Sequence, residues 1–216
     1  MIRIQKFIFN PFLENTYIVW DEYSKEAAVI DPGCYDAQEN EAIKNFIEEN
    51  QLIIKYIINT HCHLDHIFGN AFIKENFDVP LLMPRDDLFL LDLMVEQAKS
   101  YGVKFIPSPR PDELIQEGSK ISLGETEGKF IFTPGHTPGE VCLYFEKEKI
   151  CFTGDVLFNE SIGRADLWKG DFQTLINSIK EKLLSLPDDV TIYPGHESRS
   201  SIGYEKKNNP FLLNIK

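Results

Sequence analysis

Short apolar segments separated by turn residues dominate the first third of the chain. They are rich in Ile, Val, Phe and Tyr, which predicts strands at Ile2–Phe9, Asn15–Trp20 and Glu26–Ile30. The third segment ends in the turn Asp31-Pro32-Gly33. Helical spacing of apolar residues follows over Asp36–Glu49, and the nearly continuous apolar run Ile53–Ile58 then predicts a strand covered on both faces.

The rest of the chain mixes both kinds of pattern. Helices are expected at about Ile67–Asn76, Arg85–Tyr101 and Phe172–Leu184, and strands at Lys129–Thr133, Val141–Phe145, Lys149–Thr153 and Val190–Tyr193. The helix Arg85–Tyr101 carries an apolar stripe, which fits either a cap over a pocket or packing in the core. Because strands and helices do not alternate strictly, two sheets or one large mixed sheet with outer helices is predicted.

Composition and charge narrow the class of protein. A chain of 216 residues with 43% hydrophobic residues fits one domain with a large core. A net charge of −12 argues against nucleic acid as a partner. No run approaches the roughly 18 apolar residues of a membrane span, and no cleavage site follows the N-terminus, so a cytoplasmic location is expected. The four scattered cysteines are then expected to be thiols.

The five histidines of the chain fall in one recurring setting. The stretch "NTHCHLDH" follows the predicted strand Ile53–Ile58, and "FIFTPGH", "ICFTGD" and "VTIYPGH" each place a glycine turn after a strand. Four strand ends therefore present seven side chains of metal-ligand type, namely His61, His63, Asp65, His66, His136, Asp155 and His196. Such clustering predicts a metal centre at a sheet edge, with Asp155 as a carboxylate that can bridge two ions.

Simpler explanations exist for individual residues. A lone histidine after a strand is usually structural or exposed. His61 and Asp65 also have the i, i+4 spacing of the ligands in an H-E-x-x-H helix, but the glutamate is absent and the preceding run is strand-like. Cys62, between two candidate ligands, is expected to be a small buried side chain.

The order H-x-H-x-D-H, Gly-His, strand-Asp, Gly-His, preceded by "VIDPG" (Val29–Gly33), resembles the metallo-β-lactamase superfamily. The resemblance implies an αββα four-layer sandwich of two mixed sheets with outer helices. It assigns His61, His63 and His136 to one metal, and Asp65, His66 and His196 to a second. Asp155 becomes the bridge, and Asp31 a mainly structural neighbour.

Two further stretches resemble the short branch of the glyoxalase II-like hydrolases. They are "SIGRADL" (Ser161–Leu167) and "PGHESRSSIGYEKKNNPFL" (Pro194–Leu212). Only 20 residues follow His196 (216 − 196), so we expect one domain over residues 1–216 with no C-terminal glutathione-binding domain. Arg164 and Asp166 are expected to form an internal ion pair that fixes a loop.

The resemblance implies a dinuclear metal-dependent hydrolase of a small-molecule thioester such as hydroxyacylglutathione. Two divalent ions, with Zn²⁺ preferred and Fe or Mn open, would share a hydroxide that attacks the acyl carbon, and Asp65 would also orient it. The alternative is a persulfide dioxygenase with one iron on His61, His136 and Asp155. The second Pro-Gly-His favours two metals, and the oligomeric state is not set by the sequence.

Overall fold

The computed structural model of the chain describes residues 1–213. These residues form two compact units, each described by itself below. Unit 1 comprises Met1–Ile115 and Ser122–Thr126, and unit 2 comprises Gln116–Ile121 and the chain from Glu127 onwards. No helix within residues 1–213 is long and apolar enough to cross a membrane.

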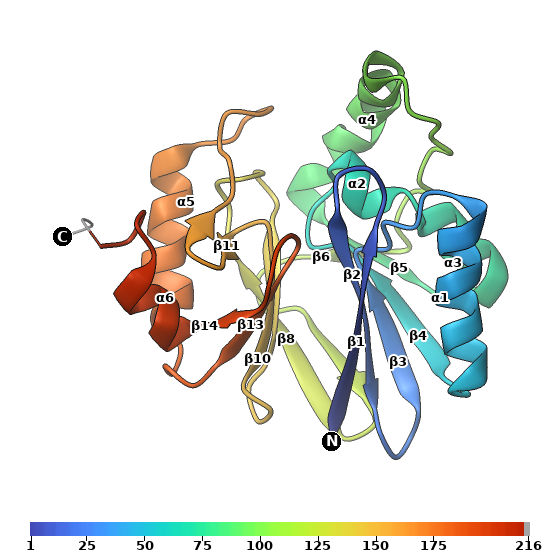
Figure 1. Cartoon of the computed structure of the whole chain (residues 1–216), viewed down its shortest axis with the longest axis horizontal. Coiled ribbons are helices and arrows are strands. Elements are labelled where there is room, and N and C mark those ends of the chain that lie inside the picture. Colours follow the sequence, from blue (N-terminus) through green and yellow to red (C-terminus); the bar gives the residue numbers. More distant parts are fainter. Residues whose placement is uncertain (214–216) are drawn as a thin grey trace. The chain divides into compact units, whose positions relative to one another are not determined.

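Unit 1 is built around a mixed sheet with the strand order β1-β2-β3-β4-β5-β6 (Figure 1). Its strands are β1 (Ile2–Phe9), β2 (Glu14–Asp21), β3 (Glu26–Ile30), β4 (Ile53–Ile58), β5 (Leu81–Pro84) and β6 (Glu113–Ile115). The first three strands pair antiparallel, whereas β3 to β6 pair in parallel. The carboxyl ends of β3 and β4 therefore meet at the same edge of the sheet, directly before Asp31 and the histidine-rich segment.

The helices of unit 1 are α1 (Ala37–Glu49), α2 (Leu64–Ile67), α3 (Asn70–Phe77) and α4 (Leu88–Tyr101), with a 3-10 turn at Arg85–Asp87. Asp36 caps α1 by accepting hydrogen bonds of 2.9 Å from the backbone N–H groups of Gln38 and Glu39. The helix α1 buries Ile43 and Ile47. The prediction of a helix over Asp36–Glu49 is thus confirmed.

The helix expected at about Ile67–Asn76 is present as α3, but it begins three residues later than predicted, because the chain breaks between α2 and α3 around Gly69. The Gly69 N–H donates to the Pro32 carbonyl over 2.7 Å. A side chain at this position would place its Cβ only 2.2 Å from Cys34 Sγ. The break is therefore imposed by a close approach to the loop after β3, a contact that helical periodicity cannot reveal.

Unit 2 is built around a second mixed sheet with the order β14-β13-β10-β9-β8-β7. Its strands are β7 (Lys120–Leu123), β8 (Thr126–Phe132), β9 (Val141–Phe145), β10 (Ile150–Gly154), β13 (Thr191–Pro194) and β14 (Ser200–Ser201), and a separate small pair is formed by β11 (Leu157–Phe158) and β12 (Ser161–Ile162). β10 and β13 run parallel, with Gly154 opposite Pro194.

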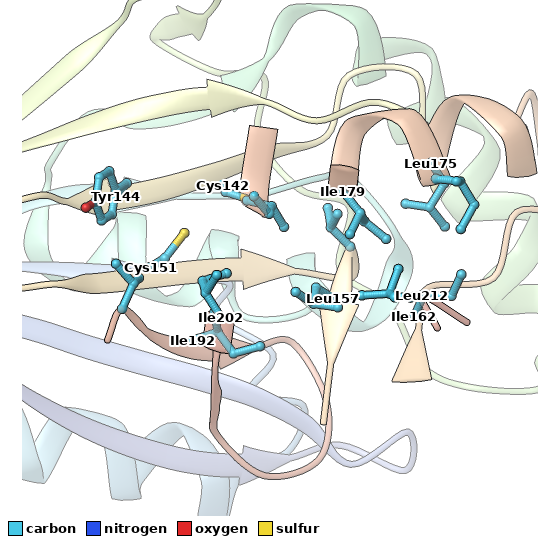
Figure 2. Close-up of a cluster of buried hydrophobic side chains, with 14 residues drawn as sticks. Cys142, Tyr144, Cys151, Leu157, Ile162, Leu175, Ile179, Ile192, Ile202 and Leu212 are labelled. Atoms are coloured by element: carbon cyan, nitrogen blue, oxygen red, sulfur yellow. The ribbon is translucent and has the colours of Figure 1, made fainter. Parts of the chain in front are cut away.

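Two helical segments cover one face of this second sheet. α5 (Phe172–Ser178) continues as a short π-helical stretch, Ile179–Leu183, and α6 is Ile202–Asn208. Buried side chains from these segments pack on β9, β10 and β13 (Figure 2). The cluster includes Cys142, Tyr144, Cys151, Leu175, Ile179, Ile192 and Ile202. The π-helical turn explains why the predicted helix Phe172–Leu184 is not α-helical throughout.

Two mixed six-stranded sheets with helices confirm the predicted α/β class. All eight expected strands are present, four with the predicted bounds and four with ends shifted by one to three residues. The prediction missed β5, β6, β7, β11, β12, β14 and α6, most of which are four residues or shorter. Strands this short carry too few residues for a period-2 pattern. The expected single-domain organisation over residues 1–216 stays a prediction.

Candidate metal centre

The histidine-rich segment of unit 1 leaves β4 and folds at once into α2. His61 lies on the loop, His63 precedes the first turn of α2, and Asp65 and His66 lie on that turn. The His61 ring centroid lies 4.8 Å from that of His63 and 4.1 Å from that of His66. Asp65 Oδ2 lies 3.7 Å from His66 Nε2. The structure therefore brings together the four ligand-type residues predicted in this segment.

Asp31, at the end of β3, holds two of these imidazoles. Its Oδ1 accepts from the Thr60 N–H and its Oδ2 from the Thr60 hydroxyl, both over 2.7 Å. The same Oδ2 lies 3.2 Å from His66 Nδ1. Thr60 Oγ1 lies 3.1 Å from His61 Nδ1, and because its proton is given to Asp31, it accepts the Nδ1 proton of His61. Nε2 of His61 then keeps its lone pair for a metal.

Buried amides fix the backbone of α2. Asn59 Nδ2 donates to the His66 carbonyl over 2.8 Å, and Asn70 Nδ2 donates to Asn59 Oδ1 over 2.9 Å. Asn10, in the turn after β1, donates from Nδ2 to the Asp65 carbonyl over 3.0 Å. Sequence reasoning missed all three residues, because asparagine in a turn is ordinary and only its burial distinguishes these.

Glu14 is a further residue that the sequence did not reveal. Its side chain is fully buried at the start of β2, and the Thr16 hydroxyl lies 2.8 Å from its Oε2. Burial raises the pKa of the Glu14 carboxyl well above its usual range, and the nearby carboxylates of Asp31 and Asp65 raise it further, although His66 opposes them. Burial therefore favours the neutral form of the Glu14 carboxyl.

Unit 2 presents its three ligand-type residues from three strand ends. His136 follows β8, Asp155 follows Gly154 of β10, and His196 follows β13. Asp155 Oδ2 lies 3.6 Å from Nε2 of His136 and 3.6 Å from Nε2 of His196. His136 Nδ1 lies 2.7 Å from the Arg164 carbonyl, which can only accept, so this nitrogen carries the proton. Nε2 of His136 is then the nitrogen that is turned toward Asp155.

Loops around these residues are also held by polar contacts. The Asp155 N–H donates to Oε1 of the buried Glu140 over 2.7 Å. Arg164 donates to both oxygens of Asp166, over 2.7 and 2.8 Å. This pair lowers the pKa of Asp166 to about 2, and it confirms the predicted ion pair. Both side chains are more than half exposed, so the pair lies at the surface of unit 2.

The donor atoms in each unit fit a divalent ion. Two ligands bound tetrahedrally at about 2.0–2.1 Å from one ion lie about 3.3 Å apart. The 3.6–3.7 Å separations between carboxylate oxygens and imidazole Nε2 atoms are longer than hydrogen bonds and close to that spacing. Imidazole and carboxylate together suit zinc or iron. Each unit thus contains a donor set of the right chemistry.

The four cysteines differ in their chemistry from the imidazoles and carboxylates of these donor sets. All four are thiols rather than disulfides, as expected, and all are buried. Burial raises the pKa of the Cys62 thiol well above its usual range, and its backbone N–H lies 3.3 Å from Asp87 Oδ2. Cys62 is therefore the small buried side chain that the sequence predicted.

Comparisons with known proteins agree with this architecture. Residues 9–196 match the Metallo-beta-lactamase superfamily. The hydroxyacylglutathione hydrolase GloC of Haemophilus influenzae is 41% identical over 93% of this chain and 93% of its own length. The crystal structure of the BLEG-1 B3 metallo-beta-lactamase is 32% identical, covers 98% of this chain and 100% of its own, and has a TM-score of 0.89. The structure of TTHA1623 in a di-iron-bound form is 33% identical, with 96% and 100% coverage and a TM-score of 0.86. The chain belongs to the metallo-beta-lactamase superfamily.

Proposed function

We propose that this protein is a dinuclear metal-dependent hydrolase that cleaves small thioesters. The observation that carries the proposal is the pair of donor sets, four residues in unit 1 and three in unit 2, each with carboxylate-to-imidazole separations of 3.6–3.7 Å. The first ion would be held by His61, His63 and His136, and the second by Asp65, His66 and His196. Asp155 would serve both ions.

The relatives support a hydrolase and leave the metal open. GloC, at 41% identity, is named for the hydrolysis of hydroxyacylglutathione. TTHA1623, at 33% identity, is described in a di-iron form, so iron is a reasonable occupant beside zinc. Imidazole-rich sets with carboxylates accept both ions, so the donor sets do not decide between them. Zn²⁺ as the native metal remains our prediction.

The residues of this chain would position the reaction. A bound divalent ion supplies Lewis acidity and activates water at neutral pH. Asp31 and Thr60 hold His61 and His66 in one orientation through the Nδ1 atoms, so the Nε2 atoms would be the ones that bind a metal. Asp65 would bind an ion and accept a hydrogen bond from a nucleophilic water. A thiolate leaves without much protonation, since its usual pKa is about 8.5, so no general acid is needed.

The decisive experiment combines metal analysis with a substrate panel. Purified protein reconstituted separately with zinc, iron and manganese is analysed for metal content, and each form is assayed on thioesters, lactones, β-lactams and phosphodiesters. We expect two equivalents of metal and hydrolysis of thioesters before the other classes. One equivalent of iron, with oxygen uptake on glutathione persulfide and no thioester hydrolysis, would replace this function by the dioxygenase.

Within the thioesters, we expect S-lactoylglutathione to be hydrolysed with weak saturation, at a KM near about 1 mM. The reason is the net charge of −12, which gives no general attraction for the carboxylates of glutathione. Thioesters of uncharged thiols should therefore compete well in kcat/KM. A micromolar KM for S-lactoylglutathione, with strong preference over other thioesters, would contradict this expectation. We also propose a cytoplasmic location, which fractionation of cells would test.

A further inference from the structure

Five aromatic side chains of unit 1 form one connected group, which we name the aromatic cluster: Phe12, Tyr35, Phe68, Tyr101 and Phe105. The Phe68 ring centroid lies 6.4 Å from that of Phe12, 4.9 Å from that of Tyr35 and 5.9 Å from that of Phe105. Phe12 in turn lies 5.8 Å from Tyr101. These separations are typical of interacting rings. The residues come from the β1–β2 turn, the loop after β3, the end of α2, and the end of α4 with the loop after it.

The outer part of the aromatic cluster is open to solvent. Phe12 is 38% exposed and Tyr101 is 52% exposed, whereas Phe68 at the centre is only 7% exposed. Two aliphatic side chains adjoin these rings in sequence, Leu13 at 67% and Ile106 at 71% exposure. Folding alone does not explain an apolar rim of this kind, because these side chains gain little from burial within the chain.

The turn that carries Phe12 has a defined backbone conformation that is held by hydrogen bonds. Asn10 and Leu13 both have positive φ angles, 53° and 58°, a conformation that is uncommon for residues other than glycine. The Phe12 N–H donates to Asn10 Oδ1 over 3.0 Å, and the Leu13 N–H donates to the Asn10 carbonyl over 3.1 Å. The exposed ring is therefore held in place by local hydrogen bonds, at a cost in backbone strain.

The aromatic cluster is joined directly to the candidate metal ligands of unit 1. Phe68 is the residue that ends α2, two positions after His66. Asn10, which holds the Phe12 turn, also donates to the Asp65 carbonyl over 3.0 Å. The aromatic cluster therefore adjoins the end of the ligand segment in sequence, and Asn10 holds both the Phe12 turn and the Asp65 backbone.

We infer that the aromatic cluster binds an apolar group of the thioester substrate, so that the enzyme prefers thioesters with an apolar acyl or thiol portion. This inference rests on the proposed function. The rings carry no charge, in a protein whose net charge of −12 disfavours anionic substrates. Contact of an apolar group with exposed rings removes apolar surface from water on both sides, which favours binding.

The test compares acetyl and hexanoyl thioesters of one neutral thiol, N-acetylcysteamine. We expect the wild-type kcat/KM to be about tenfold higher for the hexanoyl ester, as the burial of several methylene groups allows. Phe12→Ala and Tyr101→Ala should each reduce this preference severalfold while metal content and acetyl ester hydrolysis stay within about twofold. Phe12→Leu, which keeps an apolar side chain, should retain most of the preference.

Tyr23→Ala is the matched control. Tyr23 is 83% exposed and follows β2, at the opposite end of that strand from Phe12. Eight residues of strand separate the two ends by about 26 Å. The Tyr23→Ala variant should therefore leave the hexanoyl preference unchanged.

A second arm holds the acyl group at acetyl and exchanges N-acetylcysteamine for an aromatic thiol. A preference for the aromatic thiol that Phe12→Ala removes would also support the inference and would assign the contact to the thiol portion. Equal kcat/KM for all three thioesters, or equal losses on acetyl and hexanoyl esters in the Phe12 variant, would overturn it. So would a dimer that Phe12→Ala dissociates without any change in preference.

A binding measurement separates this inference from the proposed function. The S-hexyl and S-methyl thioethers of N-acetylcysteamine cannot be hydrolysed, and calorimetry on the metal-loaded protein measures their affinities. Tighter binding of the S-hexyl compound that is lost in Phe12→Ala supports an apolar subsite even when no thioester is hydrolysed, in which case only the reaction class is wrong. Equal affinity of the two thioethers overturns the inference whatever the reaction.

Discussion

The two units present similar sets of metal-ligand side chains, but these side chains come from differently arranged parts of the sequence. Unit 1 concentrates His61, His63, Asp65 and His66 in six consecutive positions of one loop and one short helix. Unit 2 draws His136, Asp155 and His196 from the ends of three different strands. His66 is fully buried, whereas the His196 side chain is 22% exposed.

The difference shows what fixes the geometry in each case. In unit 1 the spacing follows from the local chain, and Asp31 with Thr60 orients two imidazoles at once. In unit 2 the spacing of Asp155 and His196 follows from strand register, because Gly154 pairs with Pro194 and the Gly195 N–H donates to the Gly154 carbonyl over 2.8 Å. A local change should therefore harm unit 1 more than unit 2.

Removal of one histidine from each unit gives the largest expected effects. His66→Ala and His196→Ala should each lower the metal content from two equivalents to one and reduce kcat/KM by about 10³-fold or more, because each would remove a ligand of the second metal. Only His66→Ala should also lower the melting temperature, since it leaves a cavity in a fully buried site. Metal analysis and thermal unfolding of both variants measure this. A metal content of two equivalents in His196→Ala would contradict the assignment of His196 to the second metal.

Asp65→Asn tests the charge of a ligand at nearly constant size. We expect kcat/KM to fall by about 10²-fold or more, because both positioning and electrostatic stabilisation are weakened. The fold should survive, as the hydrogen bond from Asn10 to the Asp65 carbonyl is unchanged by the substitution. Kinetics together with circular dichroism test this, and near-normal turnover would remove Asp65 from its proposed role.

Substitutions of residues that hold the ligands in place should have smaller effects on metal affinity than substitutions of the ligands themselves. Asp31→Asn should weaken metal affinity about 10–100-fold, because Asp31 contacts both Thr60 and His66. Glu140→Gln keeps an acceptor for the Asp155 N–H and should cost less than Asp31→Asn. Competition with a zinc chelator measures the metal affinity of both variants and so ranks the two losses. Equal losses would mean that unit 2 relies on buried carboxylates as strongly as unit 1 does.

The smallest effect concerns two carboxyls whose pKa is lowered to about 2, Asp21 in unit 1 and Asp166 in unit 2. The backbone N–H of Ser24 is the main cause for Asp21, which is only 6% exposed. Because the folded pKa lies below the ordinary 3.8, this stabilisation is present above about pH 4 and is lost as the pH falls toward 2.

Asp21→Asn should therefore reduce the free energy of unfolding by about 1–2 kcal/mol at pH 7, after a discount for solvent screening, and by less at pH 3. Asp166→Asn should cause no measurable loss at either pH, because the pair with Arg164 is exposed. Urea unfolding at the two pH values measures both variants. A larger loss in Asp166→Asn would show that the loop around Arg164 contributes to stability.

The sequence predicted those parts that depend on local pattern. Strands longer than four residues show clear β-type composition, and each candidate ligand lies in the segment that follows a strand, so both could be recognised. The supporting residues could not, because Asn10, Thr60 and Asn70 have no distinctive spacing. Their role depends on burial and on partners distant in sequence, such as the contact between Asn10 and the Asp65 carbonyl. The assignment of individual ligands to individual metals stays a prediction.

The lengths of the edge strands also bear on how copies of the protein meet in concentrated solution. β6, β7 and β14 are edges of only three, four and two residues, too short to template pairing with another chain. Within residues 1–213, β1 is the one long edge of the two six-stranded sheets, with eight residues. Arg3, which donates to Glu22 over 2.6 Å, and Lys6 are exposed on it, and charged side chains on an edge strand oppose pairing with another chain. Loss of both charges would make β1 the place where edge-to-edge aggregation starts.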